Sequence, residues 1–388
     1  MVKLIASWDI NSMNGYERIL KSFRQETTDR IPIFEQSVSG SVVTEILGRP
    51  ALGFATDLHF DEAQALYLGT SAHQDFIGKL KEDYSAFVDA IDMDMVSVPW
   101  LLWEKPAQRL DEFSFLYKTE DGECIRTYYP QSRTFNASTG GSEMSSKVDV
   151  RRFIKNFGKK RSGGGILPEG YWDFLRWLID AFGQKRCVAG ASYYGIPLSG
   201  EWLILLLEDP GLVRDYLDIL TAREMCVAHL QAELGIRVIN GGGDLASKSG
   251  PVYSPSIFRD LFLPGLKRII SYYHSLGAFY IYRTDGNIWQ LAEILLSESG
   301  TDAYGEIDID AGMDLVELRR RFPRLVLWGG LSCGLLLLKG TDEQIVSETR
   351  RLRDALAPAG GWIFGSSNTL LPGTNVSGYL AALKELRI

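Results

Sequence analysis

Charged residues stand at the ends of several predicted strands, and those that follow the apolar run Ala278–Tyr282 are the most informative. Arg283 and Asp285 come directly after this run. A strand that ends in charged residues delivers functional groups to one edge of a sheet. Asp244 follows three glycines after another apolar run, and Glu306 follows a third. We expect Asp285, Asp244 and Glu306 to be catalytic, because clustered carboxylates can supply a general base or a group kept protonated by a like-charged neighbour.

The other strand ends carry polar and aromatic side chains. We expect the following residues to bind substrate: Arg283, Asn368, Tyr193, Tyr194, Asn240, Lys248, Glu35 and Trp328. Several candidates also have a structural interpretation. Asp244 could close a turn, and Asp285 could cap a helix that begins at Ile288. Arg283 could form a salt bridge with Asp244, Asp285 or Glu306.

The sequence argues against several other kinds of chemistry. None of its four histidines falls at a predicted strand end, and it has no Walker loop, no HExxH motif and no Ser-His-Asp arrangement. Cys226 and His229 share one face of a predicted helix, but two ligands do not make a zinc site. We therefore expect no bound metal and a site built from carboxylates, arginine, tyrosine and amides.

Composition bounds the class of protein. The chain has 388 residues, of which 45% are apolar and 23% charged, with a net charge of -8, as is typical of a globular protein in water. It has no basic run that would favour nucleic-acid binding. It also has no apolar stretch of about 18 residues, and we do not expect its N-terminal segment to act as a signal peptide. The four cysteines are far apart, so we expect free thiols and a cytoplasmic protein without a membrane partner.

Predicted strands alternate with predicted helices along most of the chain. The eight strands cover residues 31–35, 91–100, 186–191, 236–240, 278–282, 302–306, 325–328 and 362–364. Such alternation favours a parallel sheet, and eight units in one domain indicate an α/β fold of the (β/α)8 or TIM-barrel type, with an N-terminal helical extension over 15–30. The alternative is an open doubly wound sheet. That fold typically carries a glycine-rich phosphate-binding motif after the first strand, and residues 35–40 do not contain one. Because barrel active sites lie at the C-terminal ends of the strands, the fold should bring the candidates together. Between the fifth and sixth strands we predict a helix over 288–297.

Residues 101–165 interrupt this alternation. Two β-rich runs meet at Asp121-Gly122, which is typical of a hairpin, and the segments 140–147 and 159–165 are predicted loops. We expect a single domain over 1–388 in which 101–165 forms an insertion that covers the barrel mouth, because such insertions build on strand-end loops.

Four segments together resemble the uroporphyrinogen decarboxylase superfamily: residues 15–35, 241–269, 279–332 and 360–383. The first contains the sequence Asp-Arg-Ile-Pro at the entry to strand one. The second carries an acidic residue, a glycine, Ser-Pro and a helix that contains proline. The third carries Asp-Gly-Asn at the end of strand five, as one group of the superfamily does.

The resemblance implies two activities, and the chain departs from the pattern of each. The decarboxylases remove carboxyl groups from a tetrapyrrole without a cofactor, using an arginine-rich loop after strand one and a histidine after strand eight. Here that loop has no arginine, and Asn368 replaces the histidine. The related methyltransferases exchange methyl groups with corrinoid proteins and often use zinc held by His-x-Cys and a later cysteine. The matching residues here are Arg283, Asp285 and Asn368, so we do not expect zinc.

Three functions remain open. The first is a methyltransferase that moves a methyl group between a small, aromatic or methoxylated substrate and a corrinoid (cobalamin) protein, with Asp285 or Glu306 protonating the leaving heteroatom and no tightly bound cofactor. The second is a cofactor-independent decarboxylase or lyase in which Arg283 holds a substrate carboxylate. The third is a non-catalytic binding barrel. The superfamily also implies a homodimer.

Overall fold

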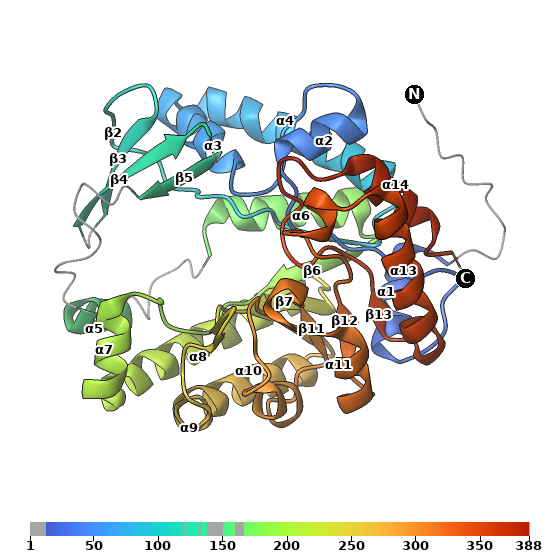
Figure 1. Ribbon diagram of the computed structural model, residues 1–388. Helices are drawn as coiled ribbons and strands as arrows, with labels where there is room; N and C mark the ends of the chain where they lie inside the picture. The colour runs from blue at the N-terminus through green and yellow to red at the C-terminus, as the bar shows by residue number, and fades with distance from the viewer. Residues whose placement is uncertain (1–12, 120–121, 132, 138–149, 160–166, 388) are drawn as a thin grey trace.

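The computed structural model describes residues 13–119, 122–131, 133–137, 150–159 and 167–387. Its centre is a parallel sheet in which each strand pairs with the next strand of this set along the chain (Figure 1). In order, the sheet contains β1 (Met95–Ser97), β6 (Cys187–Ala191), β7 (Val238–Gly242), β10 (Phe279–Arg283), β11 (Ala303–Gly305), β12 (Val326–Trp328) and β13 (Trp362–Ile363).

The segment 31–35 closes this sheet into a ring. On one side Phe34 N donates to Phe364 O at 2.9 Å, and Phe364 N donates to Pro32 O at 2.8 Å. On the other side Asp94 N, next to β1, donates to Ile33 O at 2.9 Å. The segment therefore lies between β13 and β1 as the eighth strand, and the predicted TIM-barrel fold is confirmed.

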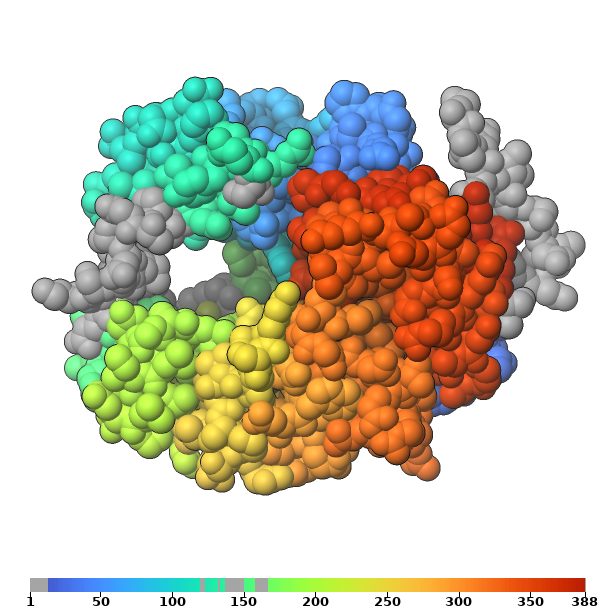
Figure 2. All heavy atoms as spheres, in the orientation of Figure 1, coloured from blue at the N-terminus to red at the C-terminus, as the bar shows by residue number. Residues whose placement is uncertain are grey.

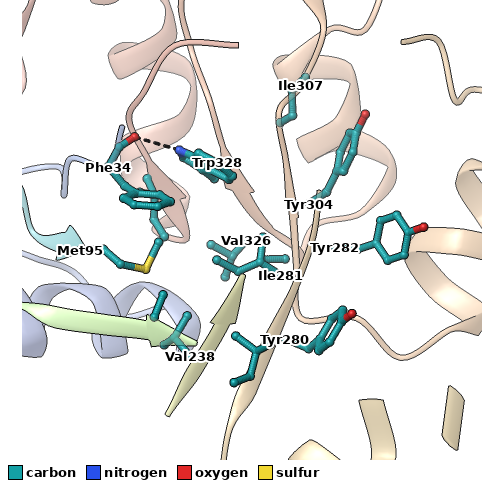
Figure 3. Packing of buried hydrophobic residues seen from close by; sticks show 14 of the residues in the cluster. Phe34, Met95, Val238, Tyr280, Ile281, Tyr282, Tyr304, Ile307, Val326 and Trp328 are labelled. Atoms are coloured by element: carbon teal, nitrogen blue, oxygen red, sulfur yellow. Dashed lines mark hydrogen bonds between the residues drawn. The ribbon is translucent and has the colours of Figure 1, made fainter. Parts of the chain in front are cut away.

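The inside of the barrel is packed with apolar side chains of alternate strand residues. Figure 3 shows Val238, Ile281 and Trp328 on the inner face of the barrel. Tyr280 of β10 and Tyr304 of β11 lie on the opposite face of the sheet, toward the helices. This follows from the period of two along a strand. All five side chains are almost fully buried, so the barrel interior is a filled core.

Helices surround the ring (Figure 1). The α-helices are α1 (Gly15–Phe23), α2 (Gly40–Leu47), α3 (Leu58–Leu68), α4 (Thr70–Ala90), α5 (Val150–Lys159), α6 (Glu169–Phe182), α7 (Gly200–Glu208), α8 (Pro210–Glu233), α9 (Pro255–Ile257), α10 (Leu263–Ser275), α11 (Leu315–Arg321), α12 (Leu336–Lys339), α13 (Asp342–Leu356) and α14 (Val376–Lys384). Shorter π and 3₁₀ turns are η2 (Phe258–Phe262), η3 (Ile294–Glu298), η4 (Ile309–Ala311) and η5 (Ala357–Ala359). Within the described residues, no helix combines the length and the apolar character needed to cross a membrane.

The predicted helix over 288–297 is wrong at its start. Turns occupy residues 289–291, helical residues begin at Ala292, and they continue into the π turn η3 at Ile294. The reason is Asn287, whose Oδ1 accepts from Trp289 N at 3.1 Å and whose Nδ2 donates to Ala311 O at 3.0 Å. These bonds hold the backbone after β10 in a turn in place of the first helical residues.

A cluster of ion pairs lies at the N-terminal ends of the strands, the end of the barrel opposite the mouth. Asp94, whose side chain is fully buried, accepts from Arg18 Nη1 at 2.5 Å and from Arg30 Nη1 at 2.6 Å. Asp29 Oδ1 accepts a further hydrogen bond from Arg18 Nε at 2.5 Å. The Asp-Arg pair before strand one therefore ties α1 and strand one to β1.

The insertion forms an antiparallel sheet of β2 (Gln108–Arg109), β3 (Ser114–Thr119), β4 (Gly122–Tyr129) and β5 (Thr134–Ala137). The pairing of β3 with β4 confirms the predicted hairpin, whose tip at 120–121 lies outside the described residues. Phe60 of α3 packs against Phe115 and Phe135 of this sheet. Figure 2 shows a hollow between this sheet (teal) and the region of α7 and α8 (green). That the insertion covers the mouth stays a prediction. The predicted loop over 140–147 lies outside the described residues, as does the loop predicted over 159–165 apart from Lys159, which ends α5.

Candidate active site at the strand ends

Four polar side chains form a layer over the apolar interior, at the C-terminal ends of the strands. Gln36, Asn240 and Arg283 each stand two residues after an inward-pointing apolar residue, so the strand period turns them inward too. Gln36 Oε1 accepts from Asn240 Nδ2 at 3.1 Å, and Gln36 Nε2 donates to Glu306 Oε1. Arg283 Nη1 lies 3.5 Å from Glu306 Oε2. The layer therefore joins four strand ends around one carboxyl group.

Glu306 reaches this layer because its backbone breaks the alternation of β11. Tyr304 faces the helices (Figure 3), and regular alternation would turn Glu306 the same way. Its φ of 58° lies in the left-handed region, which turns the side chain toward the interior. A non-glycine residue in this region costs about 1 to 3 kcal/mol and is concentrated at functional sites.

The Glu306 carboxyl is poised to exchange a proton near neutral pH. Only 3% of the residue is exposed. Burial is the main cause that raises its pKa to about 7, the Arg283 cation opposes this, and the charges of Asp285 and Asp244 add to it. At neutral pH a substantial fraction of Glu306 therefore carries a proton that it can donate.

Two buried polar atoms of the layer are without a hydrogen-bond partner among the described residues. They are Asn240 Oδ1, an acceptor, and Arg283 Nε, a donor. A buried polar atom left unpaired costs about 1 to 3 kcal/mol. The guanidinium of Arg283 also lies over the Trp100 ring, 4.9 Å from its centroid. These atoms therefore offer one acceptor and one donor to a bound molecule.

A group of carboxylates surrounds the layer. Asp285 accepts from Asn368 Nδ2 at 3.5 Å. Its pKa is raised by burial first, and then by the charges of Asp244 and Asp308. Asp308 accepts from the backbone N–H groups of Gly286 at 3.2 Å and Ala311 at 3.1 Å, whereas Asp244 is exposed. The structure thus brings together Asp285, Asp244, Glu306, Arg283, Asn240 and Asn368, as the sequence predicts.

The glycine run before Asp244 allows β7 and β10 to end close together. Gly242 has a φ of 132°, and a Cβ atom there would lie 2.1 Å from Arg283 O. Tyr193 also lies at this mouth, with 45% of its surface exposed, and the pKa of its hydroxyl is raised by burial first and then by Asp244. Lys248 sits exposed at the turn between β8 (Ala246–Ser247) and β9 (Gly250–Pro251). It forms no hydrogen bond or ion pair with another described residue, and its role in substrate binding stays a prediction.

The prediction that Tyr194 binds substrate is wrong. Its ring is buried in the helix layer, where its hydroxyl lies 2.1 Å from the position of a Cβ on Gly265 of α10 and close to Thr221 of α8. Neighbouring residues of an extended segment point to opposite sides. Tyr193 therefore reaches the mouth, and Tyr194 packs in the core.

Glu35 and Trp328 were also predicted to bind substrate, and both are buried elsewhere. Glu35 accepts from Ser366 N at 2.9 Å and from the Tyr379 hydroxyl of α14 at 3.0 Å, on the helix side of its strand. Trp328 fills the barrel interior and donates from Nε1 to Phe34 O at 3.0 Å. The alternation in strand one would have indicated Gln36 as the inward residue in place of Glu35.

Trp100 is a second residue that the sequence-based list of site residues lacks. It follows β1, and it is 40% exposed with the Arg283 guanidinium over its ring. Its position after a predicted strand is the one sequence signal that could have found it.

The three positions that hold zinc in related methyltransferases do not fit a metal here. Arg283 presents a guanidinium, a cation that cannot coordinate, and Asn368 donates its amide N–H group to Asp285. Within the described part of the chain, no three His, Cys, Asp or Glu side chains are grouped as metal ligands. We derive no step through zinc.

Comparison with known proteins supports the predicted family. The family model for uroporphyrinogen decarboxylase (URO-D) matches residues 199–387, which contain β7 to β13 and most of the site. No curated protein matches the sequence.

Solved structures with this fold include a methyltransferase from Methanosarcina mazei. It is 17% identical, with a TM-score of 0.60, and the match covers 97% of this chain and 98% of that one. A chitinase from Chromobacterium violaceum is 10% identical with a TM-score of 0.38, over 78% of this chain and 94% of that one. The first likeness supports the barrel fold, and the second is too weak to support an argument.

Proposed function

Because this chain belongs to the uroporphyrinogen decarboxylase superfamily, we propose that it is a methyltransferase that moves a methyl group between a small substrate and a corrinoid protein. The observation that carries the proposal is Glu306, a buried carboxyl with a pKa of about 7 beside Arg283 at the barrel mouth. Methyl transfer from oxygen or nitrogen leaves an electron pair on the heteroatom, and this site supplies an acid to protonate it.

The residues of the polar layer divide the work of such a transfer. The bond between the methyl carbon and the heteroatom breaks as the methyl group passes to the acceptor, and Glu306 gives its proton to the departing heteroatom. Glu306 is then a carboxylate, and Arg283, 3.5 Å away, stabilises the new charge. Gln36 holds the other oxygen of Glu306 and so fixes the direction of the carboxyl group.

The mouth offers groups that can position the substrate. Trp100 and Tyr193 present exposed aromatic faces, and Asn240 Oδ1 and Arg283 Nε are an unpaired acceptor and donor. Aromatic faces beside a few directed polar groups are typical of sites that bind small molecules. The methyl acceptor comes from the partner, because superfamily relatives exchange methyl groups with corrinoid proteins.

The test is to mix the purified protein with reduced cobalamin and a panel of methylated amines and methoxylated aromatic compounds. We expect an absorbance change that reports cobalamin methylation and that is about 10² to 10⁴ times slower in Glu306→Gln. Carbon dioxide release without cobalamin would instead identify a carboxy-lyase. If neither activity appears and Asp285→Ala leaves ligand binding unchanged, the assignment of the site fails.

A further inference from the structure

Among the described residues, the carboxylates at the mouth outnumber the cation that lies beside them, Arg283. Asp244, Asp285 and Asp308 form no ion pair with a Lys or Arg side chain within the described residues. Arg283, the cation beside them, has Glu306 as its ion-pair partner at 3.5 Å. All three aspartates are close enough to raise the pKa of a neighbouring carboxyl. A bound anion would therefore meet three uncompensated carboxylates.

The aromatic side chains at this mouth suit a cation. Trp100 is 40% exposed and Tyr193 is 45% exposed. Trp100 already holds the Arg283 guanidinium 4.9 Å from its ring centroid, so its surroundings tolerate a positive charge over the ring. Exposed aromatic faces next to carboxylates are the combination that recognises alkylammonium ions.

A separate observation points to a ligand at the floor of this mouth. Asn240 is only 7% exposed, and its Nδ2 donates to Gln36 Oε1 at 3.1 Å. The strand period turns Asn240 inward, and its buried Oδ1 has no donor from the described residues. A buried acceptor of this kind is normally paired. The missing group must be an N–H or O–H donor, which an anion such as a carboxylate does not supply.

We propose that the substrate is a small organic cation, an N-methylated ammonium ion that also carries a hydrogen-bond donor such as a hydroxyl group. This inference rests on the proposed methyl transfer at the same site. The three aspartates balance the ammonium charge, Trp100 and Tyr193 contact its methyl groups, and Asn240 Oδ1 accepts from the donor.

The step balances with the groups present. The bond between nitrogen and the transferred methyl carbon breaks, its electron pair stays on nitrogen, and the methyl group passes to the corrinoid acceptor. The neutral amine then takes the proton of Glu306 and becomes an ammonium ion again, while Glu306 becomes a carboxylate beside Arg283. The product therefore keeps the positive charge that the three aspartates balance.

A matched pair of probes tests the charge alone. Choline is a quaternary ammonium with a hydroxyl group, and 3,3-dimethylbutan-1-ol has the same shape without the charge. By isothermal titration calorimetry at low ionic strength, we expect choline to bind at least about tenfold more tightly than its neutral analogue. The preference should shrink when salt is raised.

Two charge-neutralising variants locate the effect. Asp285→Asn should weaken choline binding about three- to tenfold and leave the binding of the neutral alcohol unchanged. Asp354→Asn is the control. The Asp354 side chain is 69% exposed and lies beside Arg353 near the C-terminal end of α13, which precedes β13 and so lies at the end of the barrel opposite the mouth. It should change neither affinity. Equal affinity for both probes, no binding of either, or tighter binding of 4-methoxybenzoate would overturn the proposal.

The outcome is separable from that of the proposed function. Choline binding with the expected preference, but without methylation of cobalamin, would leave a cation-binding barrel and remove the methyltransferase proposal. Methylation of cobalamin by methoxylated acids, with no binding of choline, would keep the methyltransferase and remove the cationic substrate.

Discussion

Replacing Glu306 by Gln should change how the stability of the protein depends on pH. Burial is the main cause that raises the pKa of this carboxyl from 4.5 to about 7 in the folded chain. Each pH unit between these values corresponds to about 1.4 kcal/mol, so ionisation of Glu306 costs the native state about 3 kcal/mol. The glutamine variant has no charge to bury and should not show this cost.

The sign follows from which state holds the proton. Below pH 4.5 both the folded and the unfolded chain carry a protonated Glu306, and the cost is absent. Between pH 4.5 and 7 the unfolded chain releases its proton while the folded chain keeps it, so the wild type loses stability as the pH rises. Above pH 7 both are ionised and the full cost remains. Relative to the wild type, Glu306→Gln should therefore gain about 3 kcal/mol of unfolding free energy between pH 4.5 and pH 8.

Urea unfolding at pH 4.5, 6 and 8, followed by tryptophan fluorescence, measures this difference. Glu224→Gln is the matched control. Glu224 is also buried with its pKa raised to about 7, but it lies in the helix layer, where its Oε2 accepts from Ser192 Oγ at 2.7 Å and Tyr193 N at 3.3 Å. The carbonyl of a glutamine can keep both bonds.

Both variants should show the same dependence of stability on pH, and only Glu306→Gln should lose methyl transfer. A difference between Glu306→Gln and the wild type that stays constant from pH 4.5 to 8 would refute the raised pKa of Glu306 and with it the proposed acid. An equal loss of activity in Glu224→Gln would show that the effect is not specific to the mouth.

Three further outcomes follow from the same structure. Arg283→Met removes the cation that lowers the pKa of Glu306, so the pH above which kcat/KM declines should move upward from about 7, which a pH–rate profile measures. Gly242→Ala places a Cβ 2.1 Å from Arg283 O at a φ of 132° and should destabilise the fold by about 3 kcal/mol in urea unfolding, whereas Gly235→Ala, with open space around its Cβ, should cost less. Asp94→Asn removes the fully buried carboxylate shared by Arg18 and Arg30, which keep only the more exposed Asp29 and Asp92, and should cost about 3 to 5 kcal/mol without changing the pH profile of activity. A stable Asp94→Asn protein would contradict the role given to the ion cluster.

The sequence by itself determined the barrel. Eight apolar runs that mostly alternate with helical patterns indicate parallel strands buried on both faces, and the lack of a glycine-rich phosphate fingerprint after the first run favours a ring over an open doubly wound sheet. The same pattern determined that Asp244, Arg283, Asp285 and Glu306 lie at one edge, since the C-terminal ends of parallel strands share an edge. The start of the helix predicted over 288–297 was wrong, because one of the two side-chain bonds of Asn287 that compete with a helix reaches Ala311, far along the chain.

Only the tertiary structure decided which side chains of that edge meet. Glu35 and Tyr194 have suitable chemistry and point away, whereas their neighbours Gln36 and Tyr193 point toward the mouth. Glu306 belongs to the site only because a left-handed backbone turns it inward. The raised pKa of Glu306 depends on burial and on charges from other strands. Side-chain direction and burial are properties of the closed ring, in which strands distant in sequence become neighbours, and no local pattern of residues contains them.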